Sequence, residues 1–323
     1  MLQILIPVYN DWESVSRLLV ELDSSLALAG RDAEVILVDD GSSCTGSTLL
    51  LGTQYKAIRE IQLLKLVANL GHQRAIAVGL SWLAQEASDA PVCILDADGE
   101  DNPDHVKDLL AELEQHPETA VVFAQRGKRT ESVMVRILYT GYKLLHRILT
   151  GFTVDIGNFS VLRRSALQAL TAGSSLWNHY PAAVLQSRIP VRKLRKDRGS
   201  RYAGQSKMTL HTLIIHGLSA VSVFSDRFGV RVLMGAGLLT FVLCLGAIIL
   251  MFTTGVSSEM WVLFAALVVL LPVQFGMLSL AFVIFILSNR NSYSFIPRRD
   301  YHIFIHSMQT LYPAVRNTDE TIS

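Results

Sequence analysis

The chain has 323 residues, half of them hydrophobic, and its formal net charge is +1 at pH 7. This length predicts one or two domains, and the near-neutral charge excludes the strongly basic surface of a general nucleic-acid-binding protein. The mean hydropathy of +0.35 is high for a wholly soluble protein, and the apolar excess lies after residue 228. The first residues enter an apolar strand pattern without the features of a signal peptide. We therefore expect the first domain to stay on the cytoplasmic side of a membrane.

Strand-like and helix-like patterns alternate over the first 125 residues. Short apolar runs predict strands at 2–6, 34–38, 63–67, 92–95 and 120–124. We expect Pro7 to end the first of these strands. Helical apolar spacing lies between them at 15–22, 69–80 and 103–113. Repeated strand–turn–helix units predict an α/β fold with a parallel sheet.

The apolar run at 92–95 ends in four carboxylates within six residues, beginning with Asp96 and Asp98. In open α/β sheets the ligand crevice lies beyond the carboxyl ends of the strands. Two acids one residue apart in an extended segment point to the same side. Such a pair can hold a hard divalent cation and leave coordination positions for phosphate oxygens. The alternative is a solvated acidic turn.

Two other predicted strands also end in polar groups, namely Asn10 with Asp11 and Asp39 with Asp40. Any one of these is ordinarily a turn residue. Three such strand ends at one sheet edge suggest a nucleotide site. The chain has neither a Gly-x-Gly-x-x-Gly nor a Gly-Lys-Ser/Thr loop, so a dinucleotide-binding fold and a P-loop are not supported.

Four segments together resemble the family 2 glycosyltransferases of GT-A fold. The closest branch is the polyprenol-phosphate glycosyltransferases, of the dolichol-phosphate mannose synthase or undecaprenyl-phosphate glucosyltransferase type. The resemblance implies a Rossmann-like, mixed, mostly parallel sheet, a UDP- or GDP-sugar donor, Mg²⁺ or Mn²⁺, and inverting transfer to a polyprenyl phosphate. The segments are Pro7-Val8-Tyr9-Asn10, Val38-Asp39-Asp40-Gly41-Ser42, Asn69-x-Gly71-x-x-x-Ala75 and Asp96-Ala97-Asp98.

The resemblance also implies roles for individual residues. Asp98, with Asp96, would hold the metal on the diphosphate. That branch usually has Leu-Gln after the Asp-x-Asp, where this chain has Gly99-Glu100, so Glu100 is either a third metal ligand or solvated. The remaining donor-site candidates come from the other motifs: Pro7, Tyr9, Asn10, Asp11, Asp39, Asp40, Asn69 and Gly71.

Two basic tracts are candidates for phosphate binding. Residues 126–147 have the pattern of either an ordinary surface helix or a helix at the membrane face whose arginines hold a phosphate. By resemblance, Arg126 and Arg136 would contact the acceptor phosphate. Residues 192–208 are either solvated or a loop that closes over an anion. This tract resembles the family's mobile loop over the diphosphate, and its implied contacts are Arg198, Arg201, Ser206 and Lys207.

Asp155 begins a segment that resembles the family's Asp-x-Gly-x-Phe motif and is the candidate general base. A phosphomonoester acceptor has a second pKa of about 6 and is largely ionised at neutral pH, so it needs little deprotonation. A sugar hydroxyl acceptor would need a base. Three roles for Asp155 therefore stay open: base, orienting group, or acceptor of loop amides.

The sequence predicts four regions. A GT-A domain occupies 1–208, an interfacial amphipathic segment 209–229, two transmembrane helices 230–288, and a cytosolic tail 289–323. The spans are expected at about 232–252 and 261–287. Arginines flank the hairpin on one side, so we expect the catalytic domain and both termini in the cytosol, at the cytoplasmic membrane. Gln274 in the second span could bond a neighbouring subunit, which leaves self-association open.

Two alternatives remain. The acceptor could be a sugar hydroxyl of a lipid-linked or polysaccharide substrate. The processive form of that reading is disfavoured because the chain lacks Gln-x-x-Arg-Trp and has only two predicted spans. The chain could also be an inactive homologue that serves as a membrane scaffold. The sequence names neither the sugar, the nucleotide base nor the acceptor lipid.

Overall fold

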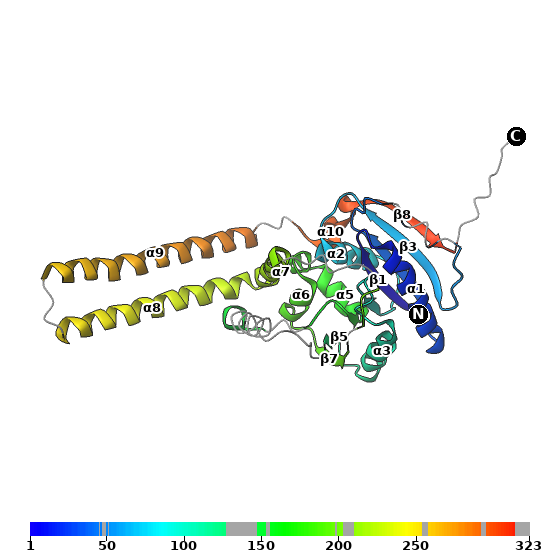
Figure 1. Ribbon diagram of the computed structural model, residues 1–323, viewed down its shortest axis with the longest axis horizontal. Helices are drawn as coiled ribbons and strands as arrows, with labels where there is room; N and C mark the ends of the chain where they lie inside the picture. Colours follow the sequence, from blue (N-terminus) through cyan, green and yellow to red (C-terminus); the bar gives the residue numbers. More distant parts are fainter. Residues whose placement is uncertain are drawn as a thin grey trace. The chain divides into compact units, whose positions relative to one another are not determined.

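The structure is a computed structural model of the chain (Figure 1). It divides into two compact units. The sheet unit comprises Met1–Glu131, Val154–Val223 and Phe295–Ser323, and the helical unit comprises Ser132–Thr153 and Phe224–Ser294. The residues that the structure describes are 1–44, 46, 50, 52–126, 147–152, 156–197, 199–202, 210–253, 258–291 and 295–313.

In the described residues, the sheet unit contains one eight-stranded sheet with the order β7-β5-β6-β4-β1-β2-β3-β8. Six of these described strands run parallel, whereas β6 and β8 run antiparallel to their neighbours. The expected mixed, mostly parallel sheet is therefore confirmed. The strands are β1 (Leu2–Val8), β2 (Ala33–Asp39), β3 (Ile58–Leu66), β4 (Val92–Ile94), β5 (Val121–Arg126), β6 (Ser160–Leu162), β7 (Val191–Lys196) and β8 (Ile305–Tyr312).

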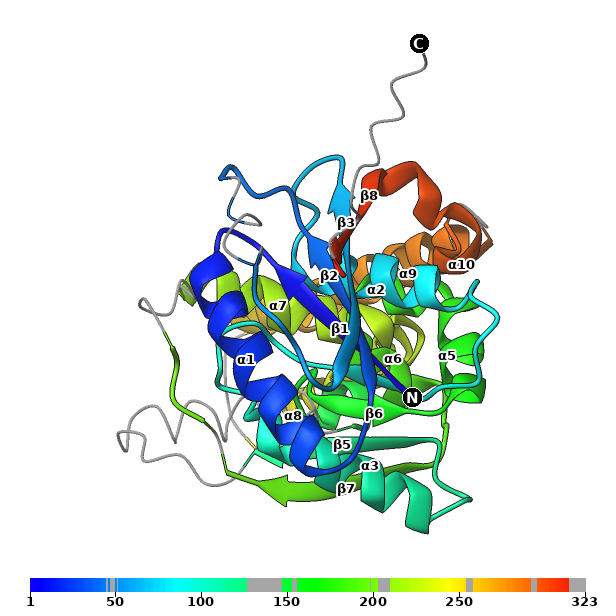
Figure 2. The same ribbon diagram turned by 90° about the vertical axis from the view of Figure 1, so that its right-hand side faces the viewer.

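Helices cover both faces of this sheet (Figures 1 and 2). One core joins the sheet to α1 (Trp12–Leu28) and α3 (Val106–Gln115). The other joins it to α2 (His72–Leu83), α5 (Arg164–Thr171) and α6 (Tyr180–Gln186). Alternate side chains of β1 enter opposite cores, as the period of a strand requires. Shorter or peripheral elements are η2 (Pro103–His105), η3 (Ser174–Trp177), α7 (Leu210–Val223), α10 (Pro297–Asp300) and η4 (Tyr301–Phe304).

The first strand does not end at Pro7, contrary to our expectation. Strand β1 continues to Val8 and pairs with β2 through Pro7. The N–H of Leu95 donates to the carbonyl oxygen of Leu5, so Leu5 faces β4, and Pro7, two residues on, faces the same side. The β4 pairing has already stopped at Leu5, so the N–H that proline lacks has no ladder partner there.

Three strands were not predicted. Strand β6 has three residues, and β7 covers the first five residues of the basic tract at 192–208, which we interpreted as solvated or as a loop. Strand β8 belongs to the segment interpreted as a tail, and it pairs with β3. Figure 2 shows β7 and β8 at opposite edges of the sheet. Charged side chains on β7 suit an edge position, because they discourage pairing with a further strand.

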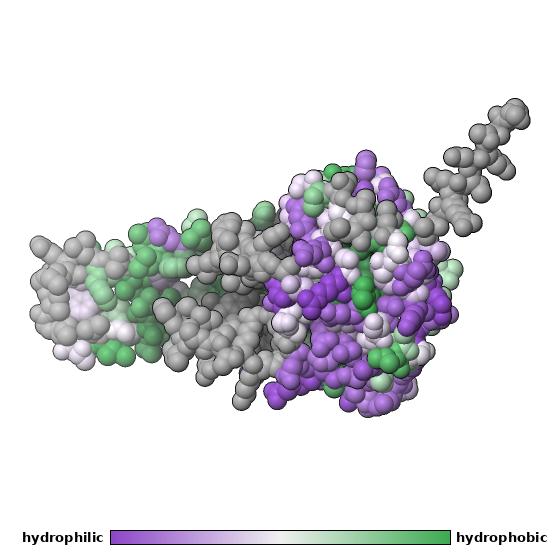
Figure 3. Space-filling view, turned by 45° about the vertical axis from the view of Figure 1, so that its right-hand side comes forward, coloured by the Kyte–Doolittle hydropathy of each residue, from purple (hydrophilic) through white to green (hydrophobic). Residues whose placement is uncertain are grey.

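The helical unit contains two long helices, α8 (Ser225–Thr253) and α9 (Ser258–Asn291), packed against each other. Within the described residues, both are long and apolar enough to cross a membrane, over Ser225–Ile249 and Phe264–Phe282. Figure 3 shows that the described surface of this hairpin is mainly hydrophobic, unlike that of the sheet unit. Arg231 donates to the carbonyl oxygens of Arg147 and Ile148, at 3.1 and 2.6 Å, and so satisfies carbonyls at the end of a short helical turn.

Asp23 of α1 fastens the start of β3, because its Oδ1 accepts the backbone N–H groups of Lys56, Ala57 and Ile58 at 2.7–3.0 Å. Asp23→Ala would leave these three N–H groups without their carboxylate acceptor. We expect a loss of about 3 kcal/mol in the free energy of unfolding, measured as a lower Tm in detergent. The neighbouring exposed Ser24→Ala is the control. Equal Tm values for the two variants would contradict this role of Asp23.

Candidate active site

The turn that follows β4 is fixed by its own carboxylates. Asp101 is buried, and its Oδ2 accepts the N–H of Asp96 at 3.1 Å. Asp98 Oδ1 accepts the N–H of Glu100 at 3.0 Å, and Gly99 between them has φ +83°, which favours glycine. The side chains of Asp96 and Asp98 are 22% and 18% exposed to solvent. Both carboxylates therefore remain reachable at the sheet edge.

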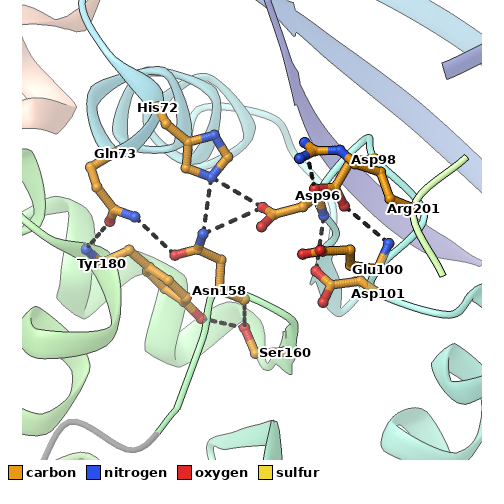
Figure 4. A network of polar contacts seen from close by, with 10 residues as sticks. All are labelled: His72, Gln73, Asp96, Asp98, Glu100, Asp101, Asn158, Ser160, Tyr180 and Arg201. Carbon is orange, nitrogen blue, oxygen red and sulfur yellow. Dashed lines mark hydrogen bonds and ion pairs between the residues drawn. The ribbon is translucent and has the colours of Figure 1, made fainter. Parts of the chain in front are cut away.

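Residues 199–202 dock onto this turn. The N–H of Gly199 donates to the carbonyl oxygen of Glu100 at 2.9 Å, and the N–H of Tyr202 donates to that of Asp98 at 3.0 Å. Between these bonds, Arg201 Nη2 lies 3.0 Å from Asp98 Oδ2 (Figure 4). The predicted Asp98 and Arg201 are thus brought together, a cationic side chain on the carboxylate expected to bind metal.

Tyr202 anchors this segment on α1. Its hydroxyl donates to Glu21 Oε2, and the Arg17 guanidinium lies 4.5 Å from the centre of its ring. Burial, together with Glu21, raises the pKa of Tyr202, so the phenol stays protonated as a donor. The ring also lies against Gly99, where an added Cβ would be 2.4 Å from it. The Gly99 found where the resembled branch has leucine therefore makes room for Tyr202.

Asp96 belongs to a polar network that sequence patterns did not predict (Figure 4). His72 Nε2 lies 3.1 Å from Asp96 Oδ1, and Asn158 Nδ2 contacts both, at 2.9 and 3.3 Å. Gln73 Nε2 donates to Asn158 Oδ1, and Gln73 Oε1 accepts the N–H of Tyr180. His72 lacks metal-type spacing to other histidines, so only its position at the start of α2 could have indicated a role. The network fixes the direction of the Asp96 carboxylate.

The environment shifts the pKa of His72 upward. Its enclosure by protein alone would lower the pKa, but the carboxylates of Asp96, Asp40 and Asp101 outweigh that effect. The side chain still exposes 44% of its surface, so solvent screens part of this attraction. His72 is thus a second side chain, besides Arg201, that contacts a carboxylate of the acidic turn.

The two predicted acids at the end of β2 have different surroundings. Asp40 is buried, and it accepts the N–H groups of Leu70 and Gly71 at 2.7 and 2.9 Å, which joins β2 to the start of α2. Burial raises the pKa of Asp40, against the lowering effect of these two bonds. Asp39 Oδ1 accepts the N–H of Ser42, and Asp39 lines a cavity of about 320 Å³. Of this pair, Asp39 is the one that a ligand in the cavity can reach.

The remaining donor-site candidates lie around the same edge. Asn10 has φ +51°, and its Oδ1 accepts the N–H of Ser43 at 2.9 Å, so it links the loops after β1 and β2. Asp11 Oδ1 accepts a bond from the Ser14 hydroxyl at the start of α1. Pro7 is buried within β1, whereas Tyr9 and Asn69 are exposed. Gly71, the last of the donor-site candidates, has φ +92° and directly precedes α2.

Residues 3–171, more than half of the chain, match the family described as "Glycosyl transferase family 2". The chain belongs to this family. This family 2 glycosyltransferase is 26% identical over 246 residues to the uncharacterized glycosyltransferase YkoT of Bacillus subtilis, with 71% of this chain and 69% of YkoT covered. It is 28% identical over 163 residues to an undecaprenyl-phosphate 4-deoxy-4-formamido-L-arabinose transferase of Klebsiella pneumoniae. That match covers 50% of this chain and 47% of the relative, so this chain spans about half of its length.

A solved structure supports the fold. Glucosyl-3-phosphoglycerate synthase from Mycobacterium tuberculosis, in complex with Mn²⁺, UDP-glucose and phosphoglyceric acid, superposes with a TM-score of 0.52 at 15% identity. The superposition covers 71% of this transferase and 80% of the synthase. The likeness confirms the GT-A fold of the sheet unit.

Several predicted residues of the transferase fall outside this description. Arg136, Asp155, Arg198, Ser206 and Lys207 lie outside the described residues. Arg126 is described only as the last residue of β5. Because β5 runs parallel to β4, Arg126 ends at the same edge of the sheet as Asp96.

The described residues fit a divalent cation held jointly with a substrate. Mg²⁺ is usually bound by one or two carboxylates together with substrate phosphate oxygens and water. Asp96 and Asp98 are two such carboxylates, partly exposed, and Asp98 already pairs with a cation. Within the described part of the chain, no group of three or more His, Cys, Asp or Glu is placed to hold a metal by itself. A role for Glu100 as a third ligand stays a prediction.

The packing of Tyr202 on Gly99 predicts a selective effect of an added methyl group. Gly99→Ala combines a positive φ with a clash against the ring, whereas Gly30→Ala has φ +62° and no atom within 4 Å of its Cβ. We expect Gly30→Ala to lose about 1 kcal/mol and Gly99→Ala about 3 kcal/mol in the free energy of unfolding.

In addition, only Gly99→Ala should accelerate trypsin cleavage after Arg201, because Tyr202 can no longer dock. Tm values and mass spectrometry of the digest measure the two effects. Equal Tm losses and equal cleavage rates in the two variants would contradict the packing role of Gly99.

Proposed function

We propose that this protein is a membrane-bound, metal-dependent, inverting glycosyltransferase that moves a sugar from a nucleotide-sugar to a polyprenyl phosphate. The observation that carries this proposal is the pairing of Asp98 with Arg201 at the end of β4. A carboxylate for a metal and a cation for phosphate oxygens meet there at one point of the sheet edge. A departing nucleoside diphosphate needs both, because its negative charge grows as the glycosidic bond breaks.

The proposed position of the donor is inferred from the order of the strands in the sheet. The cavity beside Asp39 lies at the ends of β2 and β3, and Asp98 follows β4, with β1 between. Neighbouring strands lie about 4.8 Å apart, so the cavity is about 10–14 Å from the acidic turn. A nucleoside in the cavity can therefore extend its diphosphate to Asp98 and Arg201. The M. tuberculosis synthase of the same fold binds Mn²⁺ with UDP-glucose, and we extend that pairing of ligands to this chain as part of the proposal.

The acceptor side is inferred from two features. Relatives at about 28% identity are named as undecaprenyl-phosphate sugar transferases. The helical unit exposes large apolar side chains, with Leu238, Phe241 and Leu278 each more than 60% exposed. Apolar surfaces of this extent are rare on soluble monomers, whereas lipid covers them at no cost. A lipid acceptor presents its phosphate at the membrane surface, so anchoring the catalytic domain there makes the two meet.

The proposed reaction is a single displacement. An acceptor phosphate oxygen attacks the anomeric carbon from the face opposite the diphosphate, forming one C–O bond as the bond to the diphosphate breaks, and the configuration inverts. A divalent metal, when bound, neutralises the diphosphate as it departs. Asp96 and Asp98 would hold that metal, and Arg201 would pair with a diphosphate oxygen. The phosphate is already ionised, so Asp155 need not remove a proton.

The proposed location is the cytoplasmic membrane, with the catalytic domain and both termini on the cytosolic side. The arginines near the ends of α8 and α9 support this orientation by the positive-inside rule. Arg126 and Arg136 remain the proposed contacts of the acceptor phosphate, and self-association through the helices remains open.

A transfer assay tests the proposal. Radiolabelled UDP-, GDP- and dTDP-sugars are offered in turn to the full-length protein in detergent with undecaprenyl phosphate. We expect label from one donor class to enter the lipid phase, and Asp98→Asn to reduce this transfer about 100-fold or more, because the diphosphate then leaves without its metal. Removal of divalent ions with EDTA should have a similar effect, reversed by Mn²⁺ or Mg²⁺.

The matched control is Asp32→Asn, which removes a surface ion pair with Arg59 and should leave transfer unchanged. Label that enters only a soluble glycan would show that the acceptor is a sugar hydroxyl and not a lipid phosphate. Transfer that survives both Asp98→Asn and EDTA would overturn the metal-dependent mechanism.

A further inference from the structure

A strand from the far end of the chain contributes to the lining of the cavity beside Asp39. Its lining includes Trp12 from α1, Lys65 from β3 and His306 from β8. Residues 210–291, between the sheet-forming segments, contain the helices α7, α8 and α9. The chain thus returns to the sheet after its apolar hairpin and adds His306 to the lining of the cavity.

Strand β8 is held firmly in this position. It pairs antiparallel with β3, with Ile305 opposite Leu66 and Ser307 opposite Lys65. The N–H of Val67 donates to the carbonyl oxygen of Phe304 at 2.9 Å, which extends the contact past the end of β3. His306 therefore lies at the carboxyl end of β3, the end that faces the cavity.

The chemistry of the lining suits the edge of a nucleobase. Asp39 supplies carboxylate oxygens, which accept hydrogen bonds, while Lys65 donates them. His306 can donate or accept, because a neutral imidazole has one nitrogen of each kind. Trp12 is 4% exposed, and its indole N–H has no hydrogen-bond partner in the described part of the chain. Uracil and guanine each present an N–H next to a carbonyl oxygen, so both match a lining of acceptors and donors.

We propose that β8 is part of the donor site and that His306 contacts the nucleobase and helps to select it. The inference rests on the proposed function, since it assumes that a nucleoside diphosphate binds with its base in this cavity. It adds a consequence that the acidic turn does not imply. Donor affinity depends on residues 305–312, which follow the apolar helices, as well as on the motifs of the first hundred residues.

The test measures nucleotide binding to the full-length protein in detergent. Isothermal titration calorimetry with UDP, GDP and dTDP in the presence of Mn²⁺ is carried out on the wild type, His306→Ala and Met308→Ala. Met308 is the matched control, because it lies two residues along the same strand face, is 45% exposed and does not line the cavity. Tm values show whether each variant is folded, and His306→Gln tests whether an amide restores the contact.

His306→Ala should weaken binding of the preferred nucleotide about tenfold, the effect of one lost hydrogen bond. The differences in affinity among UDP, GDP and dTDP should become smaller. His306→Gln should recover part of the affinity, and Met308→Ala should match the wild type. Unchanged affinity and preference in His306→Ala, while the wild type binds a nucleotide, would overturn this inference alone. A wild type that binds none of the three nucleotides would overturn both this inference and the proposed function.

Discussion

The negative charge gathered at the end of β4 is the constraint on which the site depends. Asp96, Asp98 and Asp101 lie within six residues, and carboxylates this close to one another must be balanced by cations or hydrogen-bond donors. The fold supplies both kinds of partner. A backbone N–H donates to Asp101, His72 contacts Asp96, and the cationic Arg201 pairs with Asp98. Side-chain partners can be exchanged: under the proposed function, Asp98 would pair with a metal and Arg201 with a diphosphate oxygen.

Carboxylates that accept backbone N–H groups hold the site together, whereas carboxylates paired with side chains can exchange partners and bind a ligand. Asp40 accepts two backbone N–H groups and joins β2 to α2, so exchanging its partners would open the loop that it holds. Asp98 pairs with Arg201, whose neighbour Tyr202 anchors the segment 199–202 on α1. Under the proposed function, the strand order would place the base at the ends of β2 and β3, the phosphates at β4 and the acceptor towards β5.

Much of the sheet unit could be predicted from the sequence, because its central strands are continuous apolar runs followed by polar turns. Asp96 and Asp98 were recognisable for the same reason. Strand β6 was not, since three residues carry too little pattern, and β7 was not, since its charges suit a solvated loop as well as an edge strand. Strand β8 and His306 could not be predicted, because β3 is more than 200 residues away in sequence and their pairing is decided by tertiary structure. His72 was not predicted because its partner, Asp96, lies 24 residues further along the chain, beyond the reach of local spacing rules.

The most direct test of the central claim is a structure of the full-length protein with Mn²⁺ and the nucleoside diphosphate that binds best, with the metal located by anomalous scattering. Our account predicts the anomalous peak at about 2.1 Å from an Asp98 oxygen, near the usual distance for a small hard cation, with Arg201 moved from Asp98 to a phosphate oxygen. A diphosphate bound away from the β4 turn, or a metal that touches neither Asp96 nor Asp98, would contradict it.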